Sequence, residues 1–330
     1  MKRLKLCFIF SFFLFNVLHG QQEPTYVLVV HGGAGNLLSE NISGELRQVY
    51  HASLLEALAV GRAILSQGGS SLDAVEAAVR VLEDAPLFNA GKGAVFTIDG
   101  TNEMDAAIMC GATVNAGAVA GVTTLKNPVT AARRVMDSSP HVMLVGKGAE
   151  HFGYEMGLEV VDPSYFFEQH RWDQYRNYLR RQQNSRSSVD ADHNMGTVGA
   201  VALDVHGNLA AATSTGGRTG KSHGRVGDVP VIGAGTYANN LTCAVSATGH
   251  GEFFIRYVVA HEISSRMLYA GSELDHAAAG VIRELGETGG DGGVIAVDRK
   301  GNISMPFNTS AMFRGYIKSD GDTFTAIFAD

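Results

Sequence analysis

The spacing of hydrophobic and polar positions changes along the chain between the periods of strands and helices. An unbroken hydrophobic run at Tyr26–Val30 ends in the glycine-rich stretch His31–Asn36, which predicts a buried strand that leads into a tight turn. Helical spacing follows at 44–67. Ser70, with an acidic residue three positions later, predicts the N-terminal cap of a second helix at 72–83. The first part of the chain therefore predicts a strand followed by two helices.

Short hydrophobic runs on either side of turn residues predict three β-hairpins. The paired runs are 94–98 with 104–109, 197–203 with 208–213, and 294–297 with 303–306. Helical spacing returns at 127–136, 252–268 and 272–285. Polar residues dominate 162–194, which predicts a linker. Because hairpins form antiparallel sheets and amphipathic helices need a sheet face to cover, the pattern predicts a layered α+β sandwich and disfavours a doubly wound parallel sheet.

The start of the chain has the pattern of a targeting segment. A basic start with Lys2, Arg3 and Lys5 precedes the hydrophobic run Leu6–Leu18. This order predicts a signal peptide at 1–20 and a secreted or periplasmic protein. An uncleaved membrane anchor is the alternative, but the run has about 13 residues and a membrane-spanning helix needs about 20.

The composition is that of a folded, acidic protein. Of its 330 residues, 45% are hydrophobic and 18% are charged, and the formal net charge is -7. This charge argues against nucleic acid or an anionic membrane as a partner, because both bind basic patches. Only Cys110 and Cys243 follow the predicted signal peptide, and they either pair or stay free. The 40 glycines exceed the usual share of about 7% and indicate backbone that passes close to other groups.

Several familiar motifs for cofactors and catalysis are absent from the sequence. The glycine turn at 31–36 lacks the spacing of a dinucleotide-binding loop. His261-Glu262 lacks the second histidine of a zinc hydrolase, and no G-x-S-x-G serine motif occurs. We therefore expect no cofactor for catalysis, and we interpret the glycine turn as backbone that lines a small-molecule pocket.

The stretch that begins at Thr197 is the most informative part of the sequence. Thr197 opens a predicted strand directly after the polar segment, although threonine is also an ordinary strand former. Threonine, glycine and charged residues then recur in the blocks Thr213–Gly217, Gly224–Asp228 and Thr248–Gly251. These neighbours make a nucleophilic role for Thr197 a stronger interpretation than the threonine alone would allow.

The blocks resemble the plant-type L-asparaginases and isoaspartyl peptidases, which are N-terminal nucleophile hydrolases whose precursor cuts itself before a threonine. The resemblance covers essentially all of the chain after the signal peptide. The matching blocks are 31–35, 88–93, 104–106, 196–202, 213–217, 224–228, 233–238, 248–252 and 306–309. The resemblance implies a four-layer αββα sandwich of the N-terminal nucleophile hydrolase type, and an amidohydrolase that converts β-aspartyl peptides and L-asparagine to L-aspartate.

By this resemblance, the chain cleaves itself at the Gly196–Thr197 bond within a single domain that spans 21–330. The products would be an α chain, 21–196, and a β chain, 197–330. Cleavage would create a catalytic base, because a threonine hydroxyl needs one and a terminal amine has a pKa of about 7.7 to 8.0. Glycine at position 196 would let the backbone adopt a strained geometry.

The catalytic residues carried over from the family are all threonines and glycines. Thr197 would be the nucleophile, and Thr215 would hold its hydroxyl in place. Thr248 and the N–H of Gly249 would form the oxyanion hole, where donors stabilise developing negative charge.

The resemblance also implies a pocket for a zwitterion. Arg225 and Asp228 would bind the free α-carboxylate and α-ammonium groups of an amino acid or dipeptide; a salt bridge in a turn is the alternative interpretation. Asn89 would support the site, unless it only forms an ordinary turn. The expected substrate-binding residues are Asn89, Arg225, Val226, Gly227, Asp228, Thr248, Gly249, His250 and Gly251.

Two further properties are implied by the resemblance alone. One is a structural sodium ion, bound by main-chain carbonyl groups. Its expected ligands are Leu82, Glu83, Ala85, Phe88, Ala90 and Lys92. The other is an (αβ)2 heterotetramer.

Two alternatives to this function remain at the level of sequence. A glycosylasparaginase-like hydrolase usually carries Asp before the threonine and Asn in the Thr-Ser-Thr block, where this chain has Gly196 and Gly216. A catalytically silent secreted binding protein of the same fold would be expected to have lost Thr197, Thr215 or Thr248, and all three are present. The sequence leaves open which of L-asparagine and β-aspartyl dipeptides is the preferred substrate.

Overall fold

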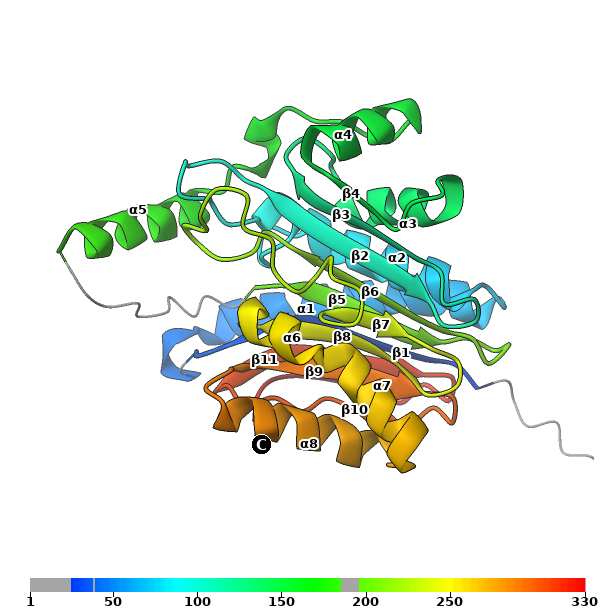
Figure 1. The fold of residues 1–330 in the computed structure, drawn as a ribbon. Coiled ribbons are helices and arrows are strands. Elements are labelled where there is room, and N and C mark those ends of the chain that lie inside the picture. The colour runs from blue at the N-terminus through cyan, green and yellow to red at the C-terminus, as the bar shows by residue number, and fades with distance from the viewer. Residues whose placement is uncertain (1–24, 38, 185–195, 330) are drawn as a thin grey trace, which may run out of the picture.

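Two β-sheets lie face to face at the centre of the molecule, and helices cover their outer faces (Figure 1). The computed structural model describes residues 25–37, 39–184 and 196–329. The predicted signal peptide at 1–20 and the last part of the predicted linker therefore lie outside the described residues.

The larger sheet brings segments from both halves of the chain together. Its strands, in spatial order, are β12 (Thr323–Phe328), β11 (Ala311–Lys318), β1 (Val27–Gly35), β5 (Val198–Leu203), β6 (Leu209–Thr215), β2 (Met104–Cys110), β3 (Ala116–Val122) and β4 (Met143–Val145). Its neighbouring strands are antiparallel, except that β3 and β4 are parallel. Thr197 immediately precedes β5, so it lies at the centre of this sheet.

The smaller sheet packs on one face of the larger sheet. Its strands, in spatial order, are β10 (Ile303–Ser304), β9 (Gly292–Asp298), β8 (Cys243–Gly249) and β7 (Thr236–Ala238). Side chains of a strand alternate between its two faces. In β1, Val27 and Val29 pack between the sheets, whereas Leu28 and Val30 join the hydrophobic core beneath the helices on the other side.

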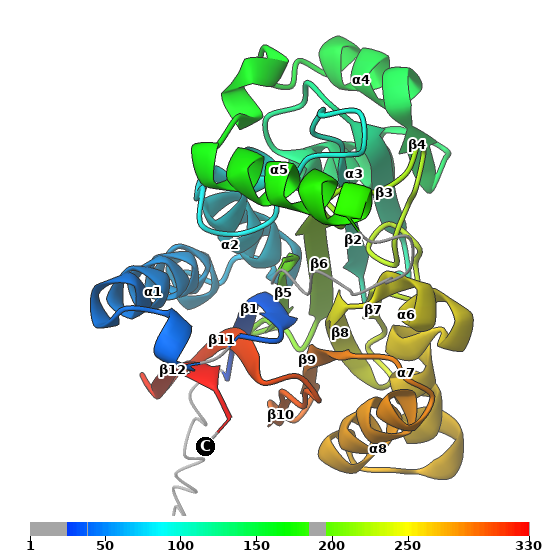
Figure 2. The ribbon, with the colours of Figure 1, turned by 90° about the vertical axis from the view of Figure 1, so that its left-hand side faces the viewer.

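The helices form the two outer layers, which Figure 2 shows from the side. The larger sheet is covered by α1 (Gly44–Ser66), α2 (Ser71–Asp84) and α3 (Pro128–Ser138), and the smaller sheet by α7 (Val259–Ala270) and α8 (Leu274–Glu287), with α6 (Gly251–Tyr257) following β8. The remaining elements are α4 (Gly146–Glu155), α5 (Gln169–Asn184) and the short 3-10 helices η1 (Ser39–Asn41), η2 (Gly91–Gly93) and η3 (Pro163–Phe166). The structure thus confirms the four-layer αββα sandwich.

Local sequence signals explain several of these elements. The side chain of Ser70 accepts a hydrogen bond from the N–H of Asp73 at 3.1 Å, which is the predicted cap of α2. Pro128 begins α3, where its missing N–H costs nothing. The hairpins predicted at 197–213 and 294–306 are present as β5–β6 and β9–β10.

The predicted hairpin at 94–109 is wrong in its first strand. Phe96 forms only an isolated bridge with Asn102, and β2 pairs with β3 instead. The side-chain amide of Asn102 donates hydrogen bonds to the carbonyl groups of Ala94 and Val95 at 2.8 and 3.2 Å. Because these two carbonyl groups accept hydrogen bonds from a side chain and not from a neighbouring strand, residues 94–98 fold as a loop.

Two other predictions, a linker and one continuous helix, are wrong. The predicted linker at 162–194 contains η3 and α5; in α5, Trp172 packs edge-on against Phe96. The predicted helix at 252–268 is broken into α6 and α7 at Val258, whose φ of 48° is left-handed. Polar composition hid the first of these features, and no local residue signals the second.

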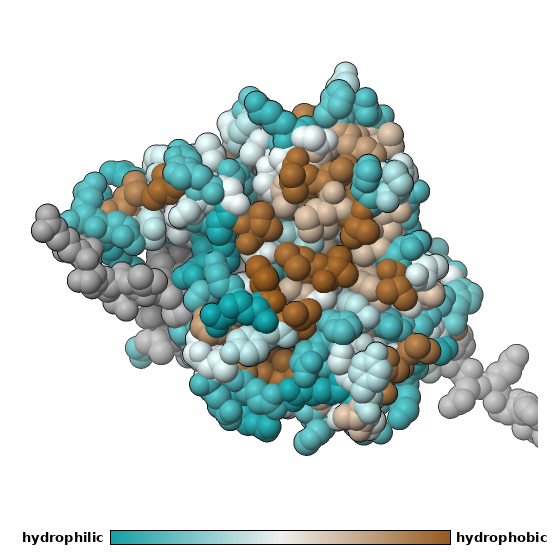
Figure 3. Space-filling view, in the orientation of Figure 1, coloured by the Kyte–Doolittle hydropathy of each residue, from teal (hydrophilic) through white to brown (hydrophobic). Residues whose placement is uncertain are grey.

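The surface carries a hydrophobic area on the face seen in Figure 1. Figure 3 shows hydrophobic residues over β2, β3, β4 and β7, and Val142, Met143 and Val145 at the edge strand β4 are exposed. Within the described ranges, no helix is long and hydrophobic enough to span a membrane. Cys110 and Cys243 are both free thiols, which answers the question left open by the sequence.

Candidate active site

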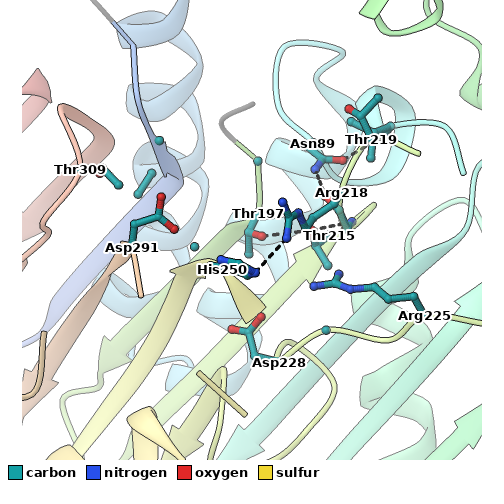
Figure 4. A pocket seen from close by; sticks show the side chains of 17 residues that line it. Asn89, Thr197, Thr215, Arg218, Thr219, Arg225, Asp228, His250, Asp291 and Thr309 are labelled. Carbon is teal, nitrogen blue, oxygen red and sulfur yellow. Dashed lines mark hydrogen bonds between the residues drawn. The ribbon is translucent and has the colours of Figure 1, made fainter. Parts of the chain in front are cut away.

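One cavity gathers most of the residues that the sequence analysis selected. It lies at the start of β5 and the ends of β6 and β8, where loops from both halves of the chain meet (Figure 4). The selected residues that line it are Asn89, Gly196, Thr197, Thr215, Arg225, Gly227, Asp228, Gly249 and His250. Thr248 and Gly251 contact residues of this lining, whereas Val226 is exposed and is not part of it.

The two threonines beside the cavity are held by the pairing of β5 and β6. Val198 lies opposite Ser214 in this pair, which brings the preceding Thr197 close to the following Thr215. The hydroxyl of Thr197 donates a hydrogen bond to Thr215 Oγ1 at 3.0 Å, and the N–H of Gly217 donates to the same oxygen at 2.9 Å. Both threonine side chains are buried. The Thr197 hydroxyl therefore has a fixed direction at the edge of the cavity.

The backbone is strained at the predicted cleavage site, but one residue later than the sequence suggested. Thr197 has a φ of 128°, a region that residues with a Cβ rarely adopt. Gly196 is required for a different reason, because a Cβ at this position would clash with the side-chain amide of Asn89. Glycine thus provides space at position 196, while the strain lies at Thr197.

Asn89 joins two loops of the site and does not merely form a turn. Its Nδ2 donates a hydrogen bond to the carbonyl group of Gly217 at 2.6 Å, and its Oδ1 accepts one from the N–H of Val95 at 3.0 Å. Its own carbonyl group accepts a bond from the N–H of Gly216 at 3.0 Å. These contacts tie the loop after α2 to the end of β6, where Thr215 lies.

Thr248 and Gly249 lie side by side at the end of β8. The N–H of Ala34 donates a hydrogen bond to Thr248 Oγ1 at 3.1 Å, so that hydroxyl can direct its own proton to another acceptor. Gly249 lines the cavity with a φ of 150°. This strand end therefore places Gly249 at one edge of the cavity, and the Thr248 hydroxyl directly behind Ala34, which also lines it.

A positive and a negative side chain meet on the other side of the cavity. A Cβ added to Gly251 would lie 2.7 Å from Asp228 Oδ1 and 3.0 Å from Arg225 Nη2, so both side chains approach the same α-carbon. Arg225 donates hydrogen bonds through Nε and Nη2 to the two carboxylate oxygens of Glu252, at 3.0 Å each. Although burial acts in the opposite direction, the bonds from Arg225 lower the pKa of Glu252 to about 2.

Asp228 is the most perturbed carboxyl group that lines the cavity. It is 6% exposed, and burial raises its pKa to about 7, although the Arg225 guanidinium acts in the opposite direction. Its Oδ2 atom is buried and has no hydrogen-bond partner among the described residues. An unpaired buried carboxylate at a cavity is a site where a cationic group of a ligand can bind.

The cavity also contains residues that the sequence analysis did not assign. These are Val95, Gly217, Arg218, Thr219, Asp291 and Thr309, whereas Ala34 and Gly35 belong to the glycine turn that was expected to line a pocket. Arg218 Nη1 lies 2.9 Å from His250 Nε2, at the edge of the charged side. Its position directly after the Thr213–Gly217 block could have indicated it. Asp291 and Thr309 reach the cavity from distant segments, which no local signal reveals.

Beneath the cavity, a chain of buried polar groups connects the two sheets. His31 Nε2 lies 2.9 Å from Ser246 Oγ, which lies 2.7 Å from Thr213 Oγ1. Thr236 in turn donates a hydrogen bond to Thr213 at 2.7 Å. Burial lowers the pKa of His31 to about 3, so this imidazole is neutral near neutral pH. The first residue of the glycine-rich turn thus has a structural contact with β8.

The segment expected to bind sodium folds back on itself beside the cavity. It runs from the end of α2 through η2, and it includes Asn89. A Cβ on Gly91 would clash with the carbonyl oxygen of Glu83, and one on Gly93 would clash with that of Phe88. Carbonyl oxygens therefore crowd the inside of the loop, a donor set that suits a hard cation. Among the described residues, no cluster of acidic, histidine or cysteine side chains could hold a metal ion.

Comparison with known proteins adds independent information to this geometry. Residues 24–327 match the family described as Asparaginase. The chain belongs to this family. It is 48% identical to the isoaspartyl peptidase of Escherichia coli (strain K12), over 92% of this chain and 96% of that protein. It is 42% identical to the isoaspartyl peptidase/L-asparaginase of Xenopus laevis, over 89% of this chain and 93% of that protein. Membership of the asparaginase family confirms the resemblance seen in the sequence and identifies the chain as an enzyme, a hydrolase.

Proposed function

We propose that the protein is a self-activating threonine amidohydrolase that converts β-aspartyl peptides and L-asparagine to L-aspartate. The observation that carries this proposal is the unpaired, buried Asp228 carboxylate beside Arg225, in the same cavity as the hydrogen-bonded Thr197 and Thr215 hydroxyls. This combination suits a substrate that is a zwitterion at one end and an amide at the other. The names of the relatives in Escherichia coli and Xenopus laevis agree with it.

Activation would be the cleavage of the Gly196–Thr197 bond. The Thr197 hydroxyl attacks the carbonyl carbon of Gly196, the C–N bond breaks, and the nitrogen takes the hydroxyl proton to become a terminal amine. Water then hydrolyses the resulting ester, which restores the hydroxyl and leaves a carboxylate on Gly196. The strained φ of 128° at Thr197 favours breaking this bond.

The cleaved chains, 21–196 and 197–330, would remain one domain because their strands alternate in the larger sheet. In spatial order, β1 of the first chain is followed by β5 and β6 of the second, and then by β2 of the first. Separating the two chains would break the β1–β5 and β2–β6 ladders. Cleavage therefore frees the Thr197 amine without taking the fold apart.

In the cleaved enzyme the new amine would act as the base for the Thr197 hydroxyl. The hydroxyl attacks the side-chain carbonyl carbon of the substrate, and Thr215 holds its oxygen in line. The Thr248 hydroxyl and the Gly249 N–H stabilise the oxyanion, a contribution of about 3 to 4 kcal/mol for each donor in comparable enzymes. The amine or ammonia leaves with the proton, and water hydrolyses the acyl-enzyme to L-aspartate.

The charged side of the cavity would bind the part of the substrate that does not react. Arg225 pairs with the α-carboxylate, and Asp228 pairs with the α-ammonium. The supporting residues are Asn89, Gly227, His250 and Gly251, which surround these two groups or tie their loops in place. Val226 is exposed and contributes through its backbone at most.

We further propose that the loop after α2 binds a structural sodium ion through main-chain carbonyl groups of Leu82, Glu83, Ala85, Phe88, Ala90 and Lys92. When bound, the ion would supply no chemistry to the reaction and would fix the loop that carries Asn89. The inward carbonyl groups of Glu83 and Phe88 support this site.

The remaining proposals concern the whole molecule. The basic start and hydrophobic run at 1–20 support a cleaved signal peptide and a secreted or periplasmic enzyme. The exposed hydrophobic residues of edge strand β4, among them Met143 and Val145, support association into an (αβ)2 heterotetramer. Light scattering of the purified, cleaved protein measures that mass directly.

Two measurements test the proposed function. A denaturing gel of purified protein should show two fragments for the wild type and one for Thr197→Ala. Incubation with β-Asp-Leu and with L-asparagine should release leucine and ammonia, and the ratio of the two rates identifies the preferred substrate. If neither product appears from protein that is fully cleaved, the proposed substrates are wrong; if Thr197→Ala is as active as the wild type, Thr197 is not the nucleophile.

A further inference from the structure

A buried pair of opposite charges has no part in the reaction described above; it lies beside the loop between β6 and β7 that carries Arg225 and Asp228. Asp105 belongs to β2 and is fully buried; Lys221 belongs to the loop between β6 and β7, and its side chain is 1% exposed. Lysine is among the residues that are least often buried, because its ammonium group loses its hydration. A buried lysine this close to a binding site therefore needs an explanation.

The polar contacts of this pair are almost entirely with each other and with backbone. The Lys221 ammonium donates a hydrogen bond to the carbonyl group of Glu103 at 3.0 Å and lies 3.9 Å from Asp105 Oδ2. Asp105 Oδ1 accepts a hydrogen bond from the N–H of Gly121 at 2.8 Å, whereas Oδ2 has no hydrogen bond of its own among the described residues. The carboxylate of Glu103 lies 4.0 Å from the ammonium. Lys221 is thus the nearest cation to an otherwise unsatisfied oxygen.

The pair touches both sides of the proposed active site. Asp105 lies directly opposite Thr215 in the pairing of β2 and β6. A Cβ on Gly217 would lie 2.9 Å from Lys221 Cδ and 3.3 Å from Arg225 Nη1, so the two cationic side chains meet at this glycine. Gly217 is also the residue whose N–H holds Thr215.

Asp105 and Lys221 stabilise each other's charged forms. Burial raises the pKa of Asp105, and the charges of Lys221 and, more weakly, Arg225 act in the opposite direction. Burial lowers the pKa of Lys221, and Asp105 acts in the opposite direction. Arg225 also acts on the charge of Asp105, while its guanidinium is held by two hydrogen bonds to Glu252. Loss of Lys221 would leave Asp105 to attract Arg225 against this hold, toward β2 and away from the cavity.

We propose that Asp105 and Lys221 are positioning residues for substrate binding: their buried ion pair holds the 216–228 loop on β2 and keeps Arg225 beside Asp228, where it can bind the α-carboxylate. This inference rests on the proposed function, and it concerns binding of the substrate and not the attack by Thr197. Neither residue touches the reacting atoms.

The test compares Asp105→Asn, Lys221→Met and the double variant. Two surface variants serve as matched controls, Asp322→Asn and Lys318→Met, which remove an exposed ion pair far from the cavity. The measurements are kcat and KM for β-Asp-Leu, the Kd of L-aspartate by calorimetry, and the extent of self-cleavage on a gel. Asp105→Asn keeps the shape and the acceptor for Gly121, so it carries the test if Lys221→Met fails to fold.

Each single variant should raise KM and the Kd of L-aspartate by about 10-fold or more, with kcat changed by less than about threefold and self-cleavage complete. The double variant, which restores the balance of charge, should recover part of this loss. A residue with only a structural role would lower kcat, cleavage and binding together, and its loss would not be rescued by a second substitution.

Two outcomes overturn the proposal and can be told apart. If the wild type binds L-aspartate and the single variants bind it equally well, or if the double variant is worse than the sum of the single ones, the positioning role is wrong. If the wild type binds no L-aspartate and hydrolyses no β-Asp-Leu, the proposed function itself fails, and this inference fails with it.

Discussion

The two sides of the cavity are built in different ways. On one side Thr197, Thr215 and Thr248 project neutral hydroxyl groups from strand ends, and the ladders of the sheets determine their positions. On the other side Arg225 and Asp228 project charges from a loop, where further charged side chains must balance them. The cost of burying a neutral hydroxyl is offset by one or two hydrogen bonds, as at these threonines, whereas a buried charge also needs a partner of opposite charge. We therefore expect changes to the first side to affect the chemical step and changes to the second to affect binding.

The largest loss of activity is expected for Asp228→Asn, which changes only the charged side of the cavity. The substitution leaves the substrate ammonium without a charged partner in a buried position, so kcat/KM should fall by about 100-fold to 1,000-fold, mostly through KM. Self-cleavage should be unaffected, because that reaction needs no zwitterion. Steady-state kinetics and a denaturing gel measure the two effects, with Asp322→Asn as the control. Incomplete cleavage in Asp228→Asn would show that the two sides are not independent.

For Thr215→Val we expect a smaller loss of activity, which lies in kcat and not in KM. The variant keeps the shape of the side chain but removes the oxygen that accepts hydrogen bonds from Thr197 and from the N–H of Gly217. We expect kcat to fall by about 30-fold to 100-fold with KM nearly unchanged, and self-cleavage to slow. Thr215→Ser retains the oxygen and should recover most of the rate. A rise in KM alone would place Thr215 on the binding side.

The neutral side of the site and the central strands were also the part that the sequence predicted best. Strong hydrophobic runs predicted β1, β5 and β6, and Thr197 and Thr215 lie at the ends of two of these strands. Their neighbourhood follows from the ladder between β5 and β6, because the register of a hairpin determines which residues face each other. The hydrophobic runs and the short turn between them were sufficient to predict this hairpin, whereas the roles of Thr197 and Thr215 came from the family resemblance.

The charged side depends on contacts between segments that are distant in the sequence, and a local pattern does not contain these contacts. Asp291 and Thr309, across the cavity from Arg225 in Figure 4, likewise reach it only because β8 and β9 pair and the chain returns beside β1. Lys221 gave no signal in the sequence, since its burial depends on Asp105 in another strand. The helix α5 was missed for the same reason: its few anchoring side chains, such as Trp172, are surrounded by polar residues.

The pH dependence of activity should also separate the two sides. Burial raises the pKa of Asp228 to about 7, and only the ionised carboxylate pairs with the substrate ammonium. Below about pH 7, kcat/KM should therefore fall by up to about 10-fold for each unit of pH, as the carboxyl group takes up a proton. The Asp228→Asn variant should lack this fall in kcat/KM at low pH, whereas Thr215→Val should retain it. If kcat/KM of Asp228→Asn falls equally steeply below about pH 7, the titrating group is not Asp228 but another group, such as the Thr197 amine.

The smallest expected effect concerns stability. The folded-state pKa of Asp228 lies above its ordinary value of 3.8, so the folded protein holds a proton that the unfolded chain has already released. The free energy of unfolding therefore decreases as the pH rises from about 4 to about 7, and this loss is complete above that range. A difference of about 3 pKa units corresponds to about 4 kcal/mol. Asp228→Asn removes this cost of burying an ionised carboxylate, so its Tm in the absence of substrate should exceed that of the wild type by up to about 7 °C above pH 7, and the difference should vanish near pH 4. Thermal denaturation at several pH values measures this. Thr215→Val should show no pH-dependent rise in Tm, because a buried neutral hydroxyl does not titrate in this range. Such a rise would mean that the threonine side of the cavity also contains a buried group whose ionisation destabilises the fold.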